Sequence, residues 1–195
     1  MTESELPTFH IPTGTCVPPA QVTPKPMVSL DSPALLVMTD LTEVRAATVD
    51  PDATLPNAEQ LMIHQGVRLL FVVRDFPCVE GLVTTTDIWG DRPMRVVEQR
   101  QIRHDEVTVA DVMSELSSLD AIDYDVLSQA TVSQVAATFR KFGRSHLLVL
   151  QAATSTSPAR IRGVLSMTQL ERQLGHPIGS TEIADTFSAV QRVLA

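Results

Sequence analysis

The chain has 195 residues, of which 44% are hydrophobic and 4% aromatic, so it can form one or two domains with an aliphatic core. Its net charge of -8 argues against a general nucleic-acid binder, which needs a basic face, and against a polybasic membrane anchor. No apolar run is long enough to span a bilayer, and the polar N-terminus is unlike a signal peptide. We therefore expect no nucleic-acid partner, no membrane partner and a cytoplasmic location.

The N-terminal segment, residues 1–33, is rich in proline and holds seven of the thirteen prolines of the chain. Proline fixes φ and lacks an amide hydrogen, which excludes helix and favours extended structure. We predict an extended tail at residues 1–33 that either lies across a domain or is disordered.

Residues 34–108 begin with the pattern of a mixed α and β fold. Residues 46–49 predict a short strand, and a helix is predicted to start after the N-cap Thr54 and to end at Gly66. Residues 67–73 are too uniformly apolar to have a solvated face, which predicts a buried strand.

The segment from Gly81 to Asp87, with the sequence GLVTTTD, has the pattern of a strand that leads into a helix. Thr84 is placed to cap that helix, and Asp87 lies in its first turn. A helix start offers free amide groups to an anion, and a carboxylate there can accept hydrogen bonds from two ribose hydroxyls. A capping box without any ligand explains the same spacing, so both interpretations stay open.

The chain after this motif is predicted to lose regular structure. Gly90 and Pro93 interrupt the helix, and residues 94–108 have the mixed charges of a solvated linker. We assign residues 34–108 to a first repeat with its linker.

Residues 109–179 repeat the order of the first segment. Thr131 and Gln134 fit a capping box, Gly143 ends the helix, and a buried strand starts at His146. The second motif then follows at residues 163–169, where Ser166 matches Thr84, Thr168 matches Thr86 and Gln169 matches Asp87. Residues 180–195 have the apolar stripe of a last, C-terminal helix.

These residues resemble a tandem pair of CBS domains, also called a Bateman module, of the small stand-alone bacterial type. The resemblance is carried by residues 67–73, by the motif at residues 81–87, by residues 109–113 and by the second motif at residues 163–169. It implies an α+β fold in which two β-α-β-β-α repeats, each with a three-stranded sheet, pack about a pseudo-twofold axis and leave clefts between them.

The same resemblance implies a site for an adenine nucleotide or adenosyl ligand. Asp87 would hold the ribose hydroxyls, Thr84 and Thr86 would help to hold ribose or phosphate, and Arg68 would face the phosphates. Arg144 lies one position earlier in the second repeat and is a weaker match. The second motif has Gln169 in place of the acid and Ser145 in place of Arg68, so Ser166 and Gln169 are most simply interpreted as a capping box.

Other chemistries find little support in the sequence. The five histidines are scattered without metal-ligand spacing, and no catalytic motif is visible. We expect no metal site, no cofactor and no enzymatic activity. The favoured hypothesis is a homodimeric regulatory module that senses AMP, ADP, ATP or S-adenosylmethionine and acts on an unidentified effector protein. The alternative is a structural or dimerisation module that binds no ligand.

Overall fold

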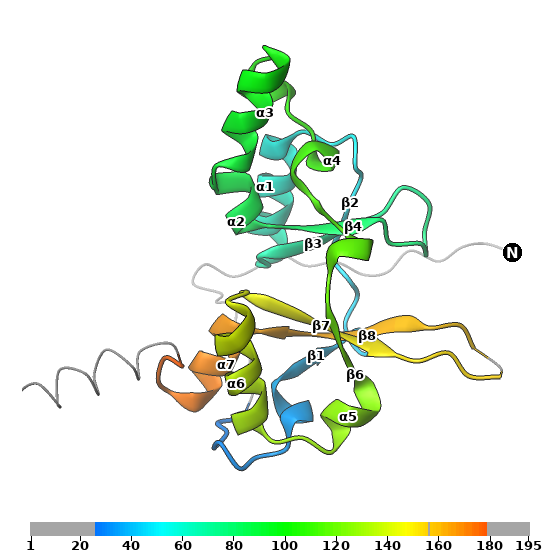
Figure 1. Cartoon of the computed structure of the whole chain (residues 1–195), viewed down its shortest axis with the longest axis vertical. Helices are drawn as coiled ribbons and strands as arrows, with labels where there is room; N and C mark the ends of the chain where they lie inside the picture. Colours follow the sequence, from blue (N-terminus) through cyan, green and yellow to red (C-terminus); the bar gives the residue numbers. More distant parts are fainter. Residues whose placement is uncertain (1–25, 156, 179–195) are drawn as a thin grey trace, which may run out of the picture.

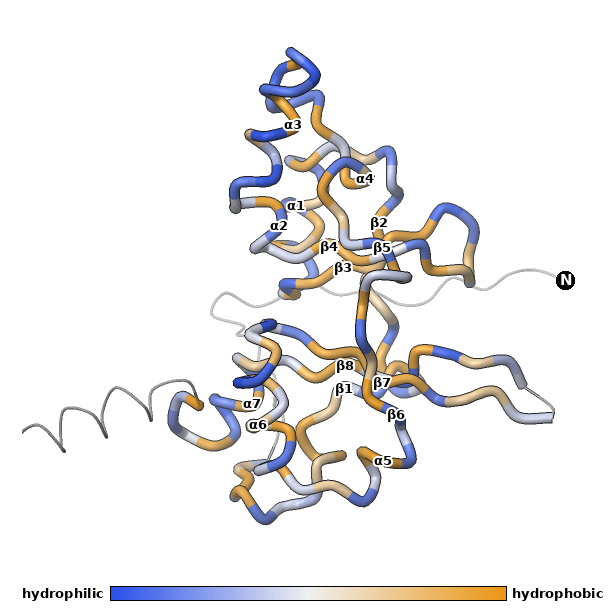
Figure 2. The backbone as a smooth tube through the Cα atoms, viewed as in Figure 1, coloured by the Kyte–Doolittle hydropathy of each residue, from blue (hydrophilic) through white to orange (hydrophobic). Residues whose placement is uncertain are grey.

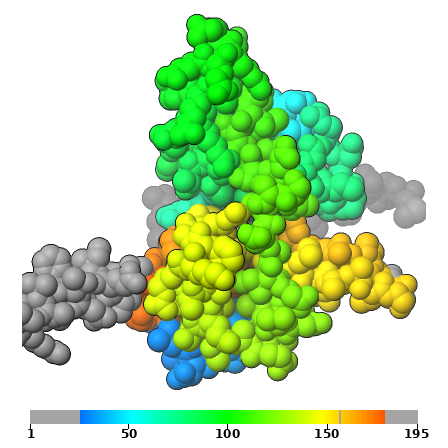
Figure 3. All heavy atoms as spheres, in the orientation of Figure 1, coloured from blue at the N-terminus to red at the C-terminus, as the bar shows by residue number. Residues whose placement is uncertain are grey.

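The structure is a computed structural model that describes residues 26–155 and 157–178. The C-terminal helix predicted at residues 180–195, and most of the tail predicted at residues 1–33, lie outside the described residues. The described chain is an α+β fold of two halves that are stacked along its long axis, each built on one four-stranded sheet (Figures 1 and 3).

The first half follows the predicted order of strand, helix, two strands and helix, with further short elements after it. Its elements are β2 (Thr48–Val49), α1 (Leu55–Gln65), β3 (Leu69–Val72), β4 (Gly81–Thr84), α2 (Thr85–Trp89), α3 (Arg92–Arg100), the 3₁₀ turn η2 (His104–Glu106), α4 (Val109–Val112), β5 (Ser114–Glu115) and η3 (Leu116–Ser118).

The second half repeats this order. Its elements are η1 (Ala34–Val37), β1 (Met38–Asp40), β6 (Ala121–Asp123), α5 (Tyr124–Ser128), α6 (Val132–Phe142), β7 (His146–Gln151), β8 (Arg160–Ser166) and α7 (Met167–Leu174). The helices α1 and α6 end as predicted, because Gly66 and Gly143 both take the left-handed conformation that favours glycine.

The two sheets exchange a strand. The strand β1 precedes the first half in sequence, but it pairs antiparallel with β8 of the second half. In the same way β5 precedes the second half and pairs antiparallel with β4 of the first. The strand orders are therefore β2-β3-β4-β5 and β6-β7-β8-β1, which are equivalent under a pseudo-twofold axis.

This exchange corrects two expectations from the sequence. The sheets have four strands each, where the resemblance implied three. Residues 34–40 were assigned to the first repeat and residues 109–115 to the second, but their strands complete the opposite sheets. The sequence alone could not reveal this exchange, because tertiary contacts determine which strand a given strand pairs with.

The glycine of each motif makes the exchange possible. A Cβ atom on Gly81 would lie 2.5 Å from the backbone oxygen of Ser114 on β5, and one on Gly163 would lie 2.9 Å from the backbone oxygen of Thr39 on β1. Both distances are shorter than any real contact of a Cβ atom. Glycine is therefore required where the exchanged strand crosses close above the motif.

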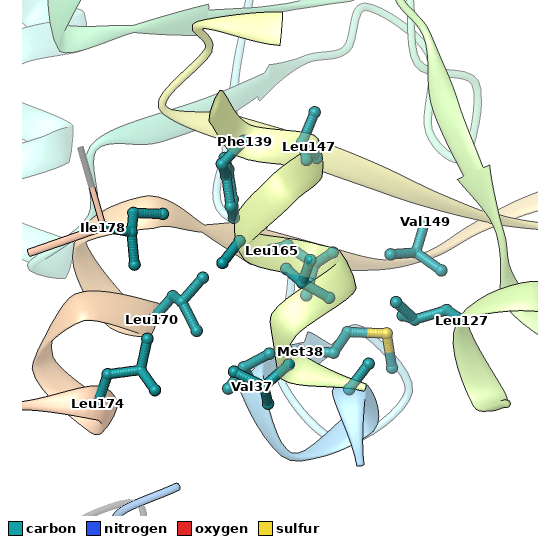
Figure 4. Packing of buried hydrophobic residues seen from close by; sticks show 14 residues of the cluster. Val37, Met38, Leu127, Phe139, Leu147, Val149, Leu165, Leu170, Leu174 and Ile178 are labelled. Atoms are coloured by element: carbon teal, nitrogen blue, oxygen red, sulfur yellow. The ribbon is translucent and has the colours of Figure 1, made fainter. Parts of the chain in front are cut away.

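Each half has its own aliphatic core, and a smaller cluster joins them. The core of the second half gathers residues of α5, α6, α7 and the sheet around Phe139 and Leu165 (Figure 4). The core of the first half is built around Leu55, Leu70 and Val83. The joining cluster contains Leu69, Phe71, Leu82 and Leu148 from β3, β4 and β7. The halves thus meet through the apolar faces of their sheets, while α3 is largely hydrophilic (Figure 2).

The predicted linker at residues 94–108 contains a helix. The helix α3 starts at Arg92 and has Pro93 in its first turn, where proline's missing amide hydrogen costs nothing. Proline therefore starts this helix rather than preventing it. Arg92 donates to the carbonyl of Val112 at 2.8 Å, so the helix is also fixed to the end of α4.

The last residues of the predicted tail lie against the second half. The amide of Val28 donates to the carbonyl of Gln173 on α7 at 3.0 Å. The side-chain amide of Gln173 donates in turn to the carbonyls of Pro26 and Leu36, at 3.1 and 3.2 Å. Gln173 is only 3% exposed, so residues 26–36 are joined to α7 by a buried side chain.

Two ligand clefts between the halves

The first motif forms the predicted helix start. Thr84 is the N-cap of α2, and its backbone amide and hydroxyl both donate to Asp87 Oδ2, at 2.9 and 2.7 Å. Asp87 Oδ1 accepts from Arg92 Nη1 at 3.1 Å. The capping-box interpretation is thus confirmed, and the carboxylate is held in a fixed position with 13% of its side chain exposed.

Asp87 opens into a cavity of about 570 Å³ between the halves, which we call the Asp87 cleft. The first half contributes Thr84, Thr86, Asp87 and Arg92. The second half contributes Arg144, Ser145 and His146, and the connection between the halves contributes Asp120. The volume lies within the range of small-molecule sites.

A second cavity, of about 360 Å³, contains the second motif and is called the Gln169 cleft. The second half contributes Ser166, Thr168, Gln169 and Arg172. The first half contributes Arg68, and the segment after β1 contributes Arg45. The two clefts are therefore pseudo-symmetric counterparts, each with one motif.

The arginines cross between the halves. Arg68 was predicted to join Asp87, but it lies in the Gln169 cleft, where its Nη1 donates to Thr168 Oγ1 at 3.1 Å. Arg144, the weaker sequence match, lies in the Asp87 cleft. Each motif thus faces the residue that follows the first helix of the other half. The predicted site of Thr84, Thr86, Asp87 and Arg144 is brought together, and Arg68 is excluded from it.

The expected capping box at Gln169 is wrong. The Gln169 side-chain amide donates to the carbonyl of Val37 at 3.1 Å, and its oxygen accepts from Thr39 Oγ1 at 3.3 Å. The turn η1, which ends at Val37, and the exchanged strand β1, which contains Thr39, bring the two partners to α7. Gln169 therefore attaches the N-terminal segment to α7 instead of capping α7 at Ser166.

His146 is shared by the two clefts. It is the first residue of β7, lines both cavities, and its Nδ1 lies 3.1 Å from Ser145 Oγ. Burial, followed by the positive charge of Arg68, lowers the pKa of His146 to about 4, although the carboxylate of Asp87 acts in the opposite direction. The imidazole is consequently neutral near pH 7.

The two clefts differ in charge. The Asp87 cleft contains two acidic residues, Asp87 and Asp120, and two basic ones, Arg92 and Arg144. The described lining of the Gln169 cleft contains three arginines, Arg45, Arg68 and Arg172, and no carboxylate. The sequence prediction missed Arg92, Arg45 and Arg172, because none of them belongs to either motif or follows a helix-ending glycine.

The described part of the molecule lacks two further features. None of its helices has the length and apolar character that crossing a membrane requires. Within residues 26–155 and 157–178, no three His, Cys, Asp or Glu side chains are grouped as metal ligands.

Comparisons with known proteins identify the first repeat. Residues 37–88 match the family model of the CBS domain. No curated protein sequence matches the chain. Among solved structures, an uncharacterized conserved protein from Pyrococcus horikoshii is 20% identical, with a TM-score of 0.51 over 74% of this chain and 93% of that one.

Two further solved structures show weaker similarity. A putative signal-transduction protein with CBS domains from Burkholderia ambifaria is 22% identical, with a TM-score of 0.48 over 66% of this chain and 82% of that one. CBSX2, solved in complex with AMP, is 17% identical, with a TM-score of 0.49 over 72% of this chain and 93% of that one. The family model identifies residues 37–88 as a CBS domain, and the second half repeats the strand-exchanged architecture of the first.

Proposed function

We propose that this protein is a regulatory module, not an enzyme, and that it binds a ribose-containing adenine nucleotide or adenosyl compound in the Asp87 cleft. The observation that carries the proposal is a fixed carboxylate, Asp87, that opens into a cavity of about 570 Å³ together with Arg144 from the other half. A carboxylate suits vicinal hydroxyls, and a guanidinium suits a phosphate.

The carboxylate keeps capacity for a ligand. An ionised carboxylate has about four acceptor positions, and three donors from Thr84 and Arg92 contact Asp87. Arg92 Nη1 also donates to the carbonyl of Val112 at 2.8 Å, and the guanidinium has further donors, so Arg92 can give up Asp87 without leaving the end of α4. Ligand binding would then exchange one partner of Asp87 while the capping box stays in place.

A thermal-shift screen over AMP, ADP, ATP, S-adenosylmethionine and NAD tests the proposal. A ligand at one hundred times its Kd raises the free energy of unfolding by ~2.7 kcal/mol. In the variant Asp87→Asn the best ligand should lose most of this shift, because the neutral amide accepts weaker hydrogen bonds. A full shift in Asp87→Asn would contradict the proposed site.

The chain provides a matched control in Asp111. Thr108 donates its amide and hydroxyl to Asp111 Oδ2, both at 3.0 Å, and Arg100 pairs with Asp111 Oδ1 at 2.6 Å. Asp111 thus contacts the N-cap of α4 in the same way as Asp87 contacts the N-cap of α2. Asp111 lies outside the Asp87 cleft. Asp111→Asn should therefore lower the melting temperature of the free protein in the same way, and it should leave the ligand-induced shift unchanged.

One observation favours a second candidate function, a structural module that binds no ligand. The contacts of Asp87 with Thr84 and Arg92 already account for its presence as a helix cap. If every compound of the screen leaves the melting temperature unchanged, this candidate replaces the first, and the protein acts through protein contacts alone.

We also propose that the protein is a cytoplasmic homodimer whose ligand state is transmitted to an effector protein. Ile63 on α1 and Trp89 on α2 are 63% and 68% exposed, and Trp89 Nε1 donates to Glu59 of α1 at 3.2 Å. These helices thus present an apolar face. Sedimentation at micromolar concentration should give a dimer, and Ile63→Glu should dissociate it. A wild-type monomer would contradict the homodimer.

A further inference from the structure

We propose that residues 180–195 of the chain dock, as an amphipathic helix, on an apolar surface beside the end of α7 in the same molecule. We call it the Met27 surface, and it is formed by Met27 and Leu36, which are 70% and 45% exposed. The surface belongs to the second half and lies outside both clefts. Its occupation therefore does not depend on the proposed ligand of the Asp87 cleft.

The buried side chain of Gln173 brings the two residues of this surface together. Its amide donates to the carbonyls of Pro26 and Leu36, at 3.1 and 3.2 Å, so these two stretches of chain lie next to each other on α7. A Cβ atom on Gly175, the C-cap of α7, would lie 3.2 Å from Cε of Met27. Single exposed apolar side chains are common, but here two of them gather at the end of one helix.

The chain leaves the second half close to this surface. Ile178 is the last residue that the structure describes, and it is 4% exposed in the core of the second half (Figure 4). Its amide donates to Glu171 Oε1 at 3.1 Å. Three residues separate Ile178 from Gly175 and can span at most about 11 Å. The point from which residues 179–195 continue is thus fixed near Met27.

The sequence of residues 180–195 has the apolar face that such a surface would cover. Its large apolar residues recur at helical spacing, while polar residues occupy the other face. The apolar face consists of Ile183, Phe187, Val190 and Leu194. A helix of this length, about 24 Å, is only marginally stable alone in water, so it needs a partner for its apolar face.

The connection between the two parts favours this segment as the occupant. Only Gly179 separates Ile178 from residues 180–195, and so short a connection gives the segment a high effective concentration at the Met27 surface. Residues 1–25 are the other candidate within the chain. They are rich in proline, which excludes a helix with a continuous apolar stripe.

Hydrogen exchange of the full chain, measured by mass spectrometry without any ligand, tests the inference. Amides of residues 183–194 should exchange at least about tenfold more slowly in wild type than in the free peptide 180–195. Met27→Glu should abolish most of this protection, because the apolar face would have to desolvate a charge. Leu36→Glu should do the same, which keeps the test valid if one variant disturbs the fold. Phe187→Glu should also abolish it, although glutamate favours helix more than phenylalanine does.

Two matched controls place the same new charge elsewhere. Met94→Glu changes a methionine of α3 that is 52% exposed in the first half, and Ser188→Glu changes the polar face of the segment. Both variants should keep the protection of residues 183–194. Loss of protection in Met94→Glu equal to that in Met27→Glu would overturn the inference.

A mixture of the Met27→Glu and Phe187→Glu proteins tests whether the contact is made within one chain. Docking within one chain cannot be restored by mixing, whereas docking between chains would let the intact segment of one variant occupy the intact surface of the other. The inference is overturned if mixing restores protection, if the wild-type segment exchanges like the free peptide, or if Met27→Glu and Leu36→Glu both keep full protection. These outcomes are independent of the nucleotide screen.

Discussion

Arg68 and Thr168 are 100 positions apart in the chain, and the Arg68 guanidinium donates to the Thr168 hydroxyl at 3.1 Å. This bond joins the start of β3 in one half to the first turn of α7 in the other. It shows that each cleft combines a motif from one half with an arginine from the other. The loss of either half would therefore dismantle both clefts.

Because each cleft takes its arginine from the other half, the structure predicts which arginine binds the phosphate of the nucleotide. Arg144 lines the cleft that contains Asp87, so Arg144→Ala should weaken binding of AMP about tenfold by removing a charged partner of the phosphate. Calorimetric titration measures this, with Arg140→Ala as the control of equal charge. A loss in Arg68→Ala with none in Arg144→Ala would show that the arginines do not cross as described.

The strand exchange predicts that a substitution at Gly81 lowers the stability of the fold strongly. A methyl group there would lie 2.5 Å from the backbone oxygen of Ser114, and a backbone atom cannot move aside as a flexible side chain can. Gly81→Ala should lower the free energy of unfolding by ~1–3 kcal/mol, the usual cost of overpacking. Urea denaturation measures it. A change within the error of the fit would mean that β5 does not lie this close to β4.

His146 predicts a dependence of stability on pH. Its pKa is about 4 in the folded protein, against an ordinary value of 6.5. Between these values the unfolded chain binds a proton that the folded chain does not. The contribution of His146 to the free energy of unfolding is therefore fully present above pH 6.5. It is lost as the pH falls toward 4, and the loss is ~3 kcal/mol at most.

The variant His146→Leu isolates this effect, because the first half has Leu69 at the equivalent position of β3. Urea unfolding at about pH 7 and about pH 4.5 should show a smaller loss of stability in the variant than in wild type. Carboxylates with lowered pKa values, such as Asp40 and Asp111, contribute equally to both proteins. Equal losses in both would contradict the burial of His146.

The buried side chain of Gln173 predicts a local effect on the N-terminal segment. Gln173→Ala would leave the carbonyls of Pro26 and Leu36 without this donor. The cost should be ~1–3 kcal/mol, as for other buried polar groups that lose a partner. Hydrogen exchange at the amide of Val28 should become faster, while exchange in β3 should not change. Unaltered exchange at Val28 would show that Gln173 does not hold the segment.

Local signals in the sequence were sufficient for most of the regular elements. The helix α1 was predicted from its cap at Thr54 to its glycine at Gly66, because both signals act within a single turn. The same holds for the capping box at Thr84. The prediction failed at Pro93, where a residue that breaks helices stands in the first turn of α3 and starts one.

The candidate site was less predictable, because it depends on contacts between distant segments. Sequence order placed Arg68 beside Asp87, but the packing of the two halves puts it beside Thr168. Gln169 resembled a cap, and the exchange of β1 gave it the carbonyl of Val37 instead. No local pattern specifies which half a strand will join, so these contacts appear only in the folded chain.

Binding of the ribose hydroxyls by the carboxylate of Asp87 is tested most directly by one calorimetric comparison. AMP and 2′,3′-dideoxy-AMP are titrated into wild-type protein and into Asp87→Asn. Wild type should bind AMP at least about tenfold more tightly than the dideoxy compound, and Asp87→Asn should bind the two almost equally. A wild-type protein that does not distinguish them, or a variant that keeps the full difference, would contradict the claim.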